Sequence, residues 1–187
     1  MGMGIEMQAV LQKTVKTILM RKDNLYALQL IAGEGVTGKD HRIENWIQVE
    51  LAKELNKKFK VEIEDSNTNL DIVLKSNLAV RWSKGIALKV AGSGKDLADD
   101  IDDLEKSIKR GYIDEGFFII LWLLKEKLTK KSWINAFKSR EPIKALIGNR
   151  EDENIDPIFI ERGWKRLVIW CKYFGDKNTG ERLIIKK

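Results

Sequence analysis

The sequence has very few of the residues on which several common kinds of functional site depend. Its 187 residues include one cysteine, one histidine and two prolines. The single cysteine, Cys171, excludes a disulfide framework and zinc sites built from paired cysteines. The single histidine, His41, excludes multi-histidine metal sites and leaves a serine or cysteine triad almost without a base. Chemistry in this chain must therefore rest on carboxylates, lysines and backbone groups.

Long hydrophobic runs are also lacking. The longest, residues 116–124, is shorter than the roughly 18 residues needed to cross a bilayer and is closed by Lys125. The first residues lack the basic flank and apolar stretch of a secretory signal, so we expect a cytoplasmic protein without a membrane partner. Apolar residues make up 43% and charged residues 33%, a balance typical of a compact chain, and we expect residues 1–187 to form one domain.

Positive charge is in excess. The formal net charge is +6, which favours a polyanionic partner because lysine and arginine side chains that neutralise phosphates release counterions. The excess is concentrated in residues 157–187, with eight basic and three acidic residues interleaved with aromatic ones. Such aromatic residues are more often part of a core, but the basic ones can contact phosphates. The candidate contacts in this region are Lys165, Arg166, Lys172 and Lys177.

The apolar pattern changes period along the chain and predicts alternating helices and strands. Helices are expected within residues 5–31 and at residues 43–59, 96–110 and 130–139. Strands are expected at residues 60–64, 70–74, 85–90, 116–124, 158–160, 166–170 and 182–185, with a further short one at residues 80–82. Residues 140–156 read as a surface loop. The order predicts an α/β or α+β domain whose central sheet is covered on two sides.

Two of these strands carry charged residues among apolar ones. Asp71 lies inside an apolar strand, where an ionised carboxylate is costly unless a cation or hydrogen-bond donors meet it. Lys89 lies in a similar strand, and Ala87 shares its face because side chains alternate. If the strands are neighbours, these three positions converge on one small area. The ordinary alternative is a partly exposed Asp–Lys pair near the strand ends.

The order of elements around these residues resembles that of the PD-(D/E)xK nuclease superfamily. The matching pieces are Glu44 on a helix, Asp71 on a strand, Lys89 on the following strand, the helix from Asp96 and the apolar strand at residues 117–121. The resemblance covers residues 40–124 and implies an α/β, restriction-endonuclease-like fold, a central mixed β-sheet flanked by helices.

The chain departs from the family pattern at one position. The acidic residue of (D/E)xK falls on Ala87, which cannot bind a metal. Ala87 is either a Glu-to-Ala replacement in an otherwise intact active-site strand, a sign that the carboxylate has moved, with Glu62 or Glu64 as candidates, or the mark of an inactive relative. We favour the first, because the residues around Ala87 keep the alternation of an active-site strand.

The resemblance implies a function. Asp71, Glu44 and an acid at position 87 would hold Mg²⁺, and Lys89 would orient the attacking water or stabilise developing charge. The expected protein is a magnesium-dependent endonuclease acting on double-stranded DNA, most simply a restriction enzyme working as a homodimer and impaired by Ala87. A repair nuclease, a junction resolvase or a non-catalytic nucleic-acid-binding relative are the alternatives.

Two other sequence patterns, a glycine-rich stretch and a run of acidic residues, could also indicate a functional site. Residues 33–39 fit the G-x-x-x-x-G-K pattern of a phosphate-binding loop, but Asp40 stands where a serine or threonine should bind magnesium. A nucleotide hydrolase is therefore a weaker alternative, and Lys39 is also a candidate DNA contact near the Glu44 helix. The second pattern is a run of acidic residues at the start of one helix: Asp96, Asp99, Asp100, Asp102, Asp103 and Glu105. We expect these to be solvated and to suit the helix dipole.

Overall fold

The computed structural model describes residues 3–21, 40–66, 68–75, 83–90, 94–124, 156–162 and 165–175. Within these ranges it contains three helices and six strands. The helices are α1 (Met3–Met20), α3 (Asp40–Leu55) and α4 (Gly94–Lys109). The strands are β1 (Lys60–Asp65), β2 (Leu70–Lys75), β3 (Lys84–Val90), β4 (Glu115–Leu124), β5 (Ile158–Arg162) and β6 (Lys165–Gly175).

The six strands form one mixed sheet in the order β1-β2-β3-β4-β6-β5. β3 and β4 are parallel and are joined by α4, whereas the other neighbouring strands are antiparallel. A parallel pair needs such a crossover, because its second strand must start at the same edge as the first. The expected α/β architecture with a central mixed sheet is therefore confirmed.

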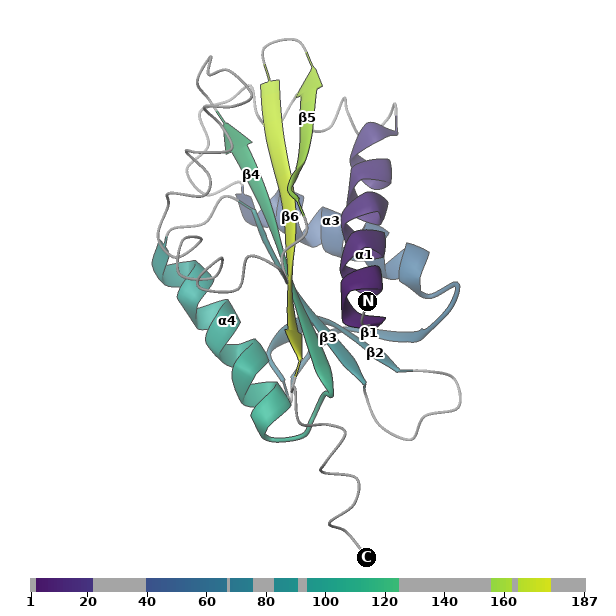
Figure 1. The fold of residues 1–187 in the computed structure, drawn as a ribbon, viewed down its shortest axis with the longest axis vertical. Helices are drawn as coiled ribbons and strands as arrows, with labels where there is room; N and C mark the ends of the chain where they lie inside the picture. Colours follow the sequence, from purple (N-terminus) through teal and green to yellow (C-terminus); the bar gives the residue numbers. More distant parts are fainter. Residues whose placement is uncertain are drawn as a thin grey trace, which may run out of the picture.

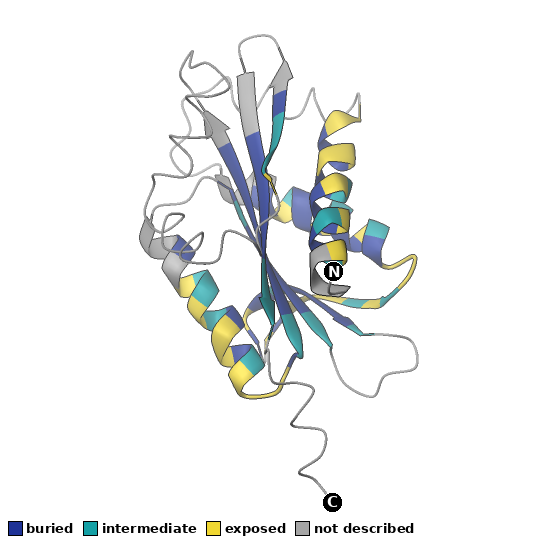
Figure 2. Ribbon diagram, in the orientation of Figure 1, coloured by how far each residue is buried: buried dark blue, intermediate teal, exposed yellow. Residues whose placement is uncertain are grey.

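The helices cover both faces of the sheet. α1 and α3 lie on one face and α4 lies on the other (Figure 1). β4 is buried on both faces because its side chains alternate between the two apolar cores: Phe117 and Ile119 pack toward α1 and α3, and Phe118 and Ile120 pack toward α4. The centre of the sheet is accordingly buried, and exposed residues lie on the outer sides of the helices and along the edge strand β1 (Figure 2).

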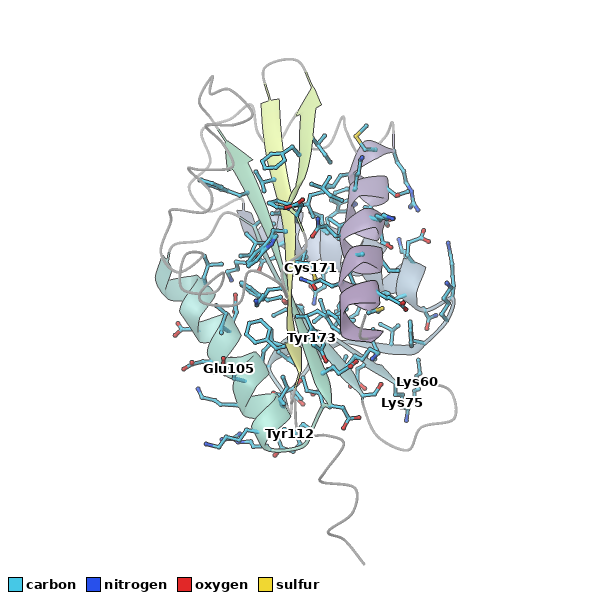
Figure 3. The ribbon with its side chains drawn as sticks, in the orientation of Figure 1. Lys60, Lys75, Glu105, Tyr112, Cys171 and Tyr173 are labelled. Atoms are coloured by element: carbon cyan, nitrogen blue, oxygen red, sulfur yellow. The ribbon has the colours of Figure 1, made fainter. Side chains whose placement is uncertain are left out.

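The first helix also completes one edge of the sheet. β5 pairs with β6 only as far as Ile158 and Ile169, so among the described residues no strand pairs with the next residues of β6 on that side. Gln8 and Gln12, one turn apart on α1, replace it: the Gln8 side chain donates to the Cys171 carbonyl, and the Cys171 N–H donates to Gln12 Oε1 at 3.0 Å. Cys171 lies on β6 beside α1 (Figure 3), and burial raises the pKa of its thiol well above the usual range.

Most elements expected from the sequence occur within a few residues of their predicted bounds. The helix expected at residues 43–59 begins earlier and ends earlier, at Asp40 and Leu55. The strand at residues 80–82, the helix at 130–139, the strand at 182–185 and all but the last residue of the loop at 140–156 lie outside the described residues. Among the described helices, none combines the length and apolar character needed to span a bilayer.

Candidate functional site

The candidate site lies where two neighbouring strands separate. β2 and β3 pair from Leu74 and Lys84 to Ile72 and Ile86, and the described ladder stops there. β3 nevertheless continues to Val90 and stays paired with β4 on its other side. Its last residues therefore have backbone groups on the β2 side that no strand of the described ranges satisfies.

Two carboxylates accept hydrogen bonds from these backbone N–H groups. Asp71 Oδ2 accepts a hydrogen bond from the Leu88 N–H at 2.6 Å, and Glu44 Oε2 accepts one from the Val90 N–H at 3.2 Å. Gln48, one helical turn after Glu44 on α3, donates to the Asp71 carbonyl at 2.8 Å. The gap between β2 and β3 is thus filled by polar side chains from one strand and one helix, and Glu44 is buried there.

Asp71, Ala87 and Lys89 share the α4 face of the sheet. Ile72 and Ile86 are register partners, and continuing this antiparallel register places Asp71 opposite Ala87. Ala87 belongs to the apolar cluster under α4 and is 3% exposed. Lys89 is two residues further along β3 and therefore projects to the same side as Ala87. The sequence-based expectation that these positions lie on one face of adjacent strands agrees with this register.

Lys89 lies between carboxylates from two helices. Its Nζ atom is 3.6 Å from Glu44 Oε1 on α3 and 3.4 Å from Asp100 Oδ2 on α4. The three side chains are 15%, 11% and 30% exposed, so water screens these ion pairs less than it would on an open surface. The Oδ2 atom of Asp100 is buried, and its partner among the described groups is the Lys89 ammonium.

The charges in this cluster shift one another's pKa values. Burial raises the pKa of Asp71 to about 6, the Leu88 N–H opposes the shift, and the negative charges of Glu44 and Asp100 reinforce it. Burial also raises the pKa of Asp100, against the attraction of Lys89. For Lys89 burial acts in the opposite direction, but Asp100 and Glu44 outweigh it and its pKa lies above the ordinary value. Lys89 is therefore a cation at neutral pH.

The donor chemistry of the cluster suits a hard divalent cation. Asp71, Glu44 and Asp100 offer carboxylate oxygens, which Mg²⁺ prefers. When all are ionised, three negative charges face one ammonium, and a divalent cation would balance the remainder. Within the described part of the chain, however, no three His, Cys, Asp or Glu side chains are already arranged to hold a metal ion. The ammonium of Lys89 lies beside both Glu44 and Asp100.

Glu62 and Glu64, the other candidates for the acidic residue missing at position 87, lie on a different strand. Glu62 and Glu64 are exposed on β1, one strand further from Ala87 than β2, and Glu64 adopts a positive φ of 54°. The charged groups that most affect the pKa of Asp71 are instead Glu44, Asp100 and Lys89.

Asp100 is the residue that sequence reasoning missed. We expected the acidic residues at the start of this helix to be solvated. Asp99 and Asp102 are exposed, but the Asp100 side chain is only 30% exposed and pairs with Lys89. Glu105, also exposed, is labelled on α4 in Figure 3. Helical spacing could have predicted that Asp100 faces inward. Asp100 is three residues after Leu97 and four before Leu104, both of which are buried, and residues at these spacings share a helix face.

The candidate nucleic-acid contacts are only partly described. Lys39 and Lys177 lie outside the described residues, as does the glycine-rich stretch at residues 33–39. Lys165 and Arg166 begin β6, opposite Arg162 and Glu161 of β5. Lys172 is 9% exposed and lies opposite Phe118, the β4 partner of Ala87, so little of its side chain is available for a phosphate.

Comparison of the chain with protein-family models, with curated proteins and with solved structures gives no match. The assignment of a function therefore depends on the residues and geometry of the chain itself.

Proposed function

We propose that the chain is a magnesium-dependent DNA endonuclease of the restriction-endonuclease-like kind. The observation that supports this most directly is the placement of Lys89. Its ammonium lies between the buried carboxylate of Glu44 and the partly buried one of Asp100, at the point where β2 leaves β3, and Asp71 fills the same gap. A buried excess of negative charge beside one lysine is costly for folding alone, so it favours a role in holding a cation.

Each residue has a specific task in this proposal. Asp71 and Glu44 would hold Mg²⁺, which when bound lowers the pKa of a coordinated water and offsets charge on the scissile phosphate. Asp71 is predominantly ionised above about pH 6, so it can serve as a ligand at neutral pH. Lys89 stays protonated and places a positive charge where the phosphate gains negative charge. Ala87 supplies no ligand, and we expect turnover to be impaired for that reason.

The net charge of +6 supports double-stranded DNA as the substrate, because contacts between basic side chains and phosphates contribute much of the affinity of proteins for DNA. A restriction enzyme acting as a homodimer is the simplest member of this class, since two symmetric subunits can each cut one strand. Repair nucleases and junction resolvases would use the same chemistry.

The decisive experiment compares cleavage of supercoiled plasmid DNA in Mg²⁺ by the original chain and by Ala87→Glu and Ala87→Asp. We expect both substitutions to increase cleavage by at least about tenfold, since a metal ligand is restored. Position 87 is buried among apolar residues, where an introduced carboxylate is costly until a cation balances it. Added Mg²⁺ should therefore raise the Tm of each variant by more than it raises the Tm of the original chain. A folded variant that shows neither effect would contradict the proposal.

A second comparison separates the ligands from Lys89. In the Ala87→Glu background, Asp71→Asn should abolish both metal binding and cleavage, whereas Lys89→Met should abolish cleavage but retain metal binding. Lys84→Met is the matched control, because Lys84 lies on the same strand and is ion-paired with Glu115 at the other end. Cleavage that survives Lys89→Met, or that Lys84→Met lowers equally, would argue against the proposed roles.

The alternative function is a non-catalytic nucleic-acid-binding protein, and the burial of Ala87 in the apolar cluster favours it. This alternative predicts DNA binding that is independent of Mg²⁺ and unchanged by Asp71→Asn, with no cleavage in either position 87 variant.

A further inference from the structure

The ammonium of Lys89 is held by carboxylates from two helices that cover opposite faces of the sheet. Glu44 reaches it from α3 at 3.6 Å, and Asp100 reaches it from α4 at 3.4 Å. The stem of a lysine side chain is long and flexible, so a single ion pair leaves its charged end free to move. Two partners on opposite sides restrict the ammonium to one place, beside the gap between β2 and β3.

The two carboxylates that contact this ammonium are not equivalent. Glu44 also accepts a hydrogen bond from the Val90 N–H, and in the proposed function it holds the cation as well. For the buried Oδ2 atom of Asp100, the partner among the described groups is Lys89. Burial lowers the pKa of Lys89, and of the two carboxylates Asp100 contributes more to raising it again. Asp100 is therefore the partner whose described contact serves Lys89.

The packing of α4 determines where the Asp100 carboxylate lies. Leu97 and Leu104 hold the inner face of α4 against the apolar cluster beneath it. Asp100 is three residues after the first leucine and four before the second, so it shares their face. Its neighbour Asp99 is exposed. The register of α4 thus brings one of its many acids to Lys89.

The place of the ammonium matters for the proposed reaction. An ammonium has three N–H donors, so two carboxylates leave at least one for a phosphate oxygen or a water molecule. That donor stabilises the charge developing on a phosphate only where it is already aimed at it. We propose that Asp100 is a positioning residue, which keeps the Lys89 ammonium in place when Glu44 holds the cation. This inference rests on the proposed endonuclease function and assigns Asp100 no contact with the cation or the DNA.

The first experiment observes the ammonium directly and needs neither Mg²⁺ nor DNA. A lysine ammonium fixed by ion pairs exchanges its protons slowly, so the ¹H–¹⁵N spectrum of the full chain should contain a Lys89 signal that Lys89→Met removes. Asp100→Asn should broaden this signal beyond detection. Asp99→Asn, the same charge change at an exposed position, should leave it intact. The ammonium of Lys84, paired with Glu115 at the other end of β3, is the internal reference.

The second experiment measures plasmid cleavage in the Ala87→Glu background. Asp100→Asn should lower kcat by at least about tenfold and change KM by less than about twofold, because a misplaced ammonium affects the transition state more than substrate binding. Asp100→Glu, which keeps a carboxylate, should recover much of the rate, and Asp99→Asn should have the rate of the background. A purely structural role of Asp100 would not separate kcat from KM. Circular dichroism confirms that each variant is folded.

The outcomes distinguish this inference from the proposed function. If the original chain gives no Lys89 signal, or if Asp100→Asn leaves that signal unchanged, the inference is overturned and the proposed endonuclease is unaffected. The same holds if the signal is lost but kcat is unchanged, or if Asp100→Glu is as slow as Asp100→Asn. If the Ala87→Glu chain itself does not cleave DNA, the proposed function and the inference are overturned together.

Discussion

Asp71→Asn should make the metal-free protein more stable at neutral pH. The asparagine side chain retains an oxygen that can accept the hydrogen bond of the Leu88 N–H, so the contact that closes the gap beside β3 is kept. What the substitution removes is a buried negative charge that repels Glu44 and Asp100. The original carboxylate is therefore expected to reduce stability whenever it is ionised and no cation balances it.

The magnitude follows from the pKa of Asp71, which rises from 3.8 to about 6 on folding. Each pKa unit corresponds to about 1.4 kcal/mol, so ionisation of this group costs the folded state about 3 kcal/mol at pH 8. The folded state holds the proton more tightly than the unfolded state between about pH 4 and pH 6. Over that interval the contribution of Asp71 to the free energy of unfolding falls as pH rises. Asp71→Asn should abolish this decrease in the free energy of unfolding, because asparagine does not ionise.

The assay is urea unfolding of both proteins in EDTA at several pH values. At pH 8 we expect the variant to be more stable by up to about 3 kcal/mol, or about 6–12 °C in Tm, with the difference vanishing below about pH 4. Saturating Mg²⁺ should reduce this difference in the free energy of unfolding, because only the original chain is expected to bind the ion and be stabilised by it. Asp99→Asn, which changes an exposed carboxylate on α4, is the control. A variant that is less stable at pH 8, or a difference independent of pH, would refute the reasoning.

Two further substitutions test how the sheet that carries the site is held together. Gly85→Ala should lower the free energy of unfolding by about 1–3 kcal/mol, measured in urea, because the added methyl group would collide with the buried side chains of Leu70 and Ile113. Gln12→Leu should cost about 1–3 kcal/mol in the same assay, because it leaves the buried Cys171 N–H at the open edge of β6 without its acceptor. Unchanged unfolding midpoints would contradict the packing at β3 and at β6, respectively.

The fold was predictable where periodicity reports burial directly. The nearly continuous apolar run at residues 116–124 indicated a strand buried on both faces, and β4 has both faces buried. Alternation predicted β1, and short apolar runs predicted β2 and β3, each to within a residue. Strand order was not predictable in the same way, because the pairing of β4 with β6 joins segments about fifty residues apart and no local pattern specifies it.

The candidate site was predictable only in the residues that break an apolar pattern. Asp71 and Lys89 interrupt strands, so their charge was conspicuous in the sequence. Asp100 belongs to a helix rich in carboxylates, where one more acid carries no signal unless the inner face is traced from Leu97 and Leu104. Gln48 was also missed, because the need for a donor at the Asp71 carbonyl exists only once β2 has left β3.

The same hydrogen bonds serve the fold and the candidate site, and this determines how the site must be tested. The carboxylates of Asp71 and Glu44 accept hydrogen bonds from the N–H groups of Leu88 and Val90, which β2 does not reach. Alanine at either acidic position would leave a backbone donor unpaired and cost about 1–3 kcal/mol regardless of any catalytic role. Asparagine and glutamine keep an acceptor oxygen and remove only the charge. A loss of metal binding in these amide variants, with the fold intact, is therefore evidence about chemistry, whereas the same loss in alanine variants would also follow from a disrupted sheet.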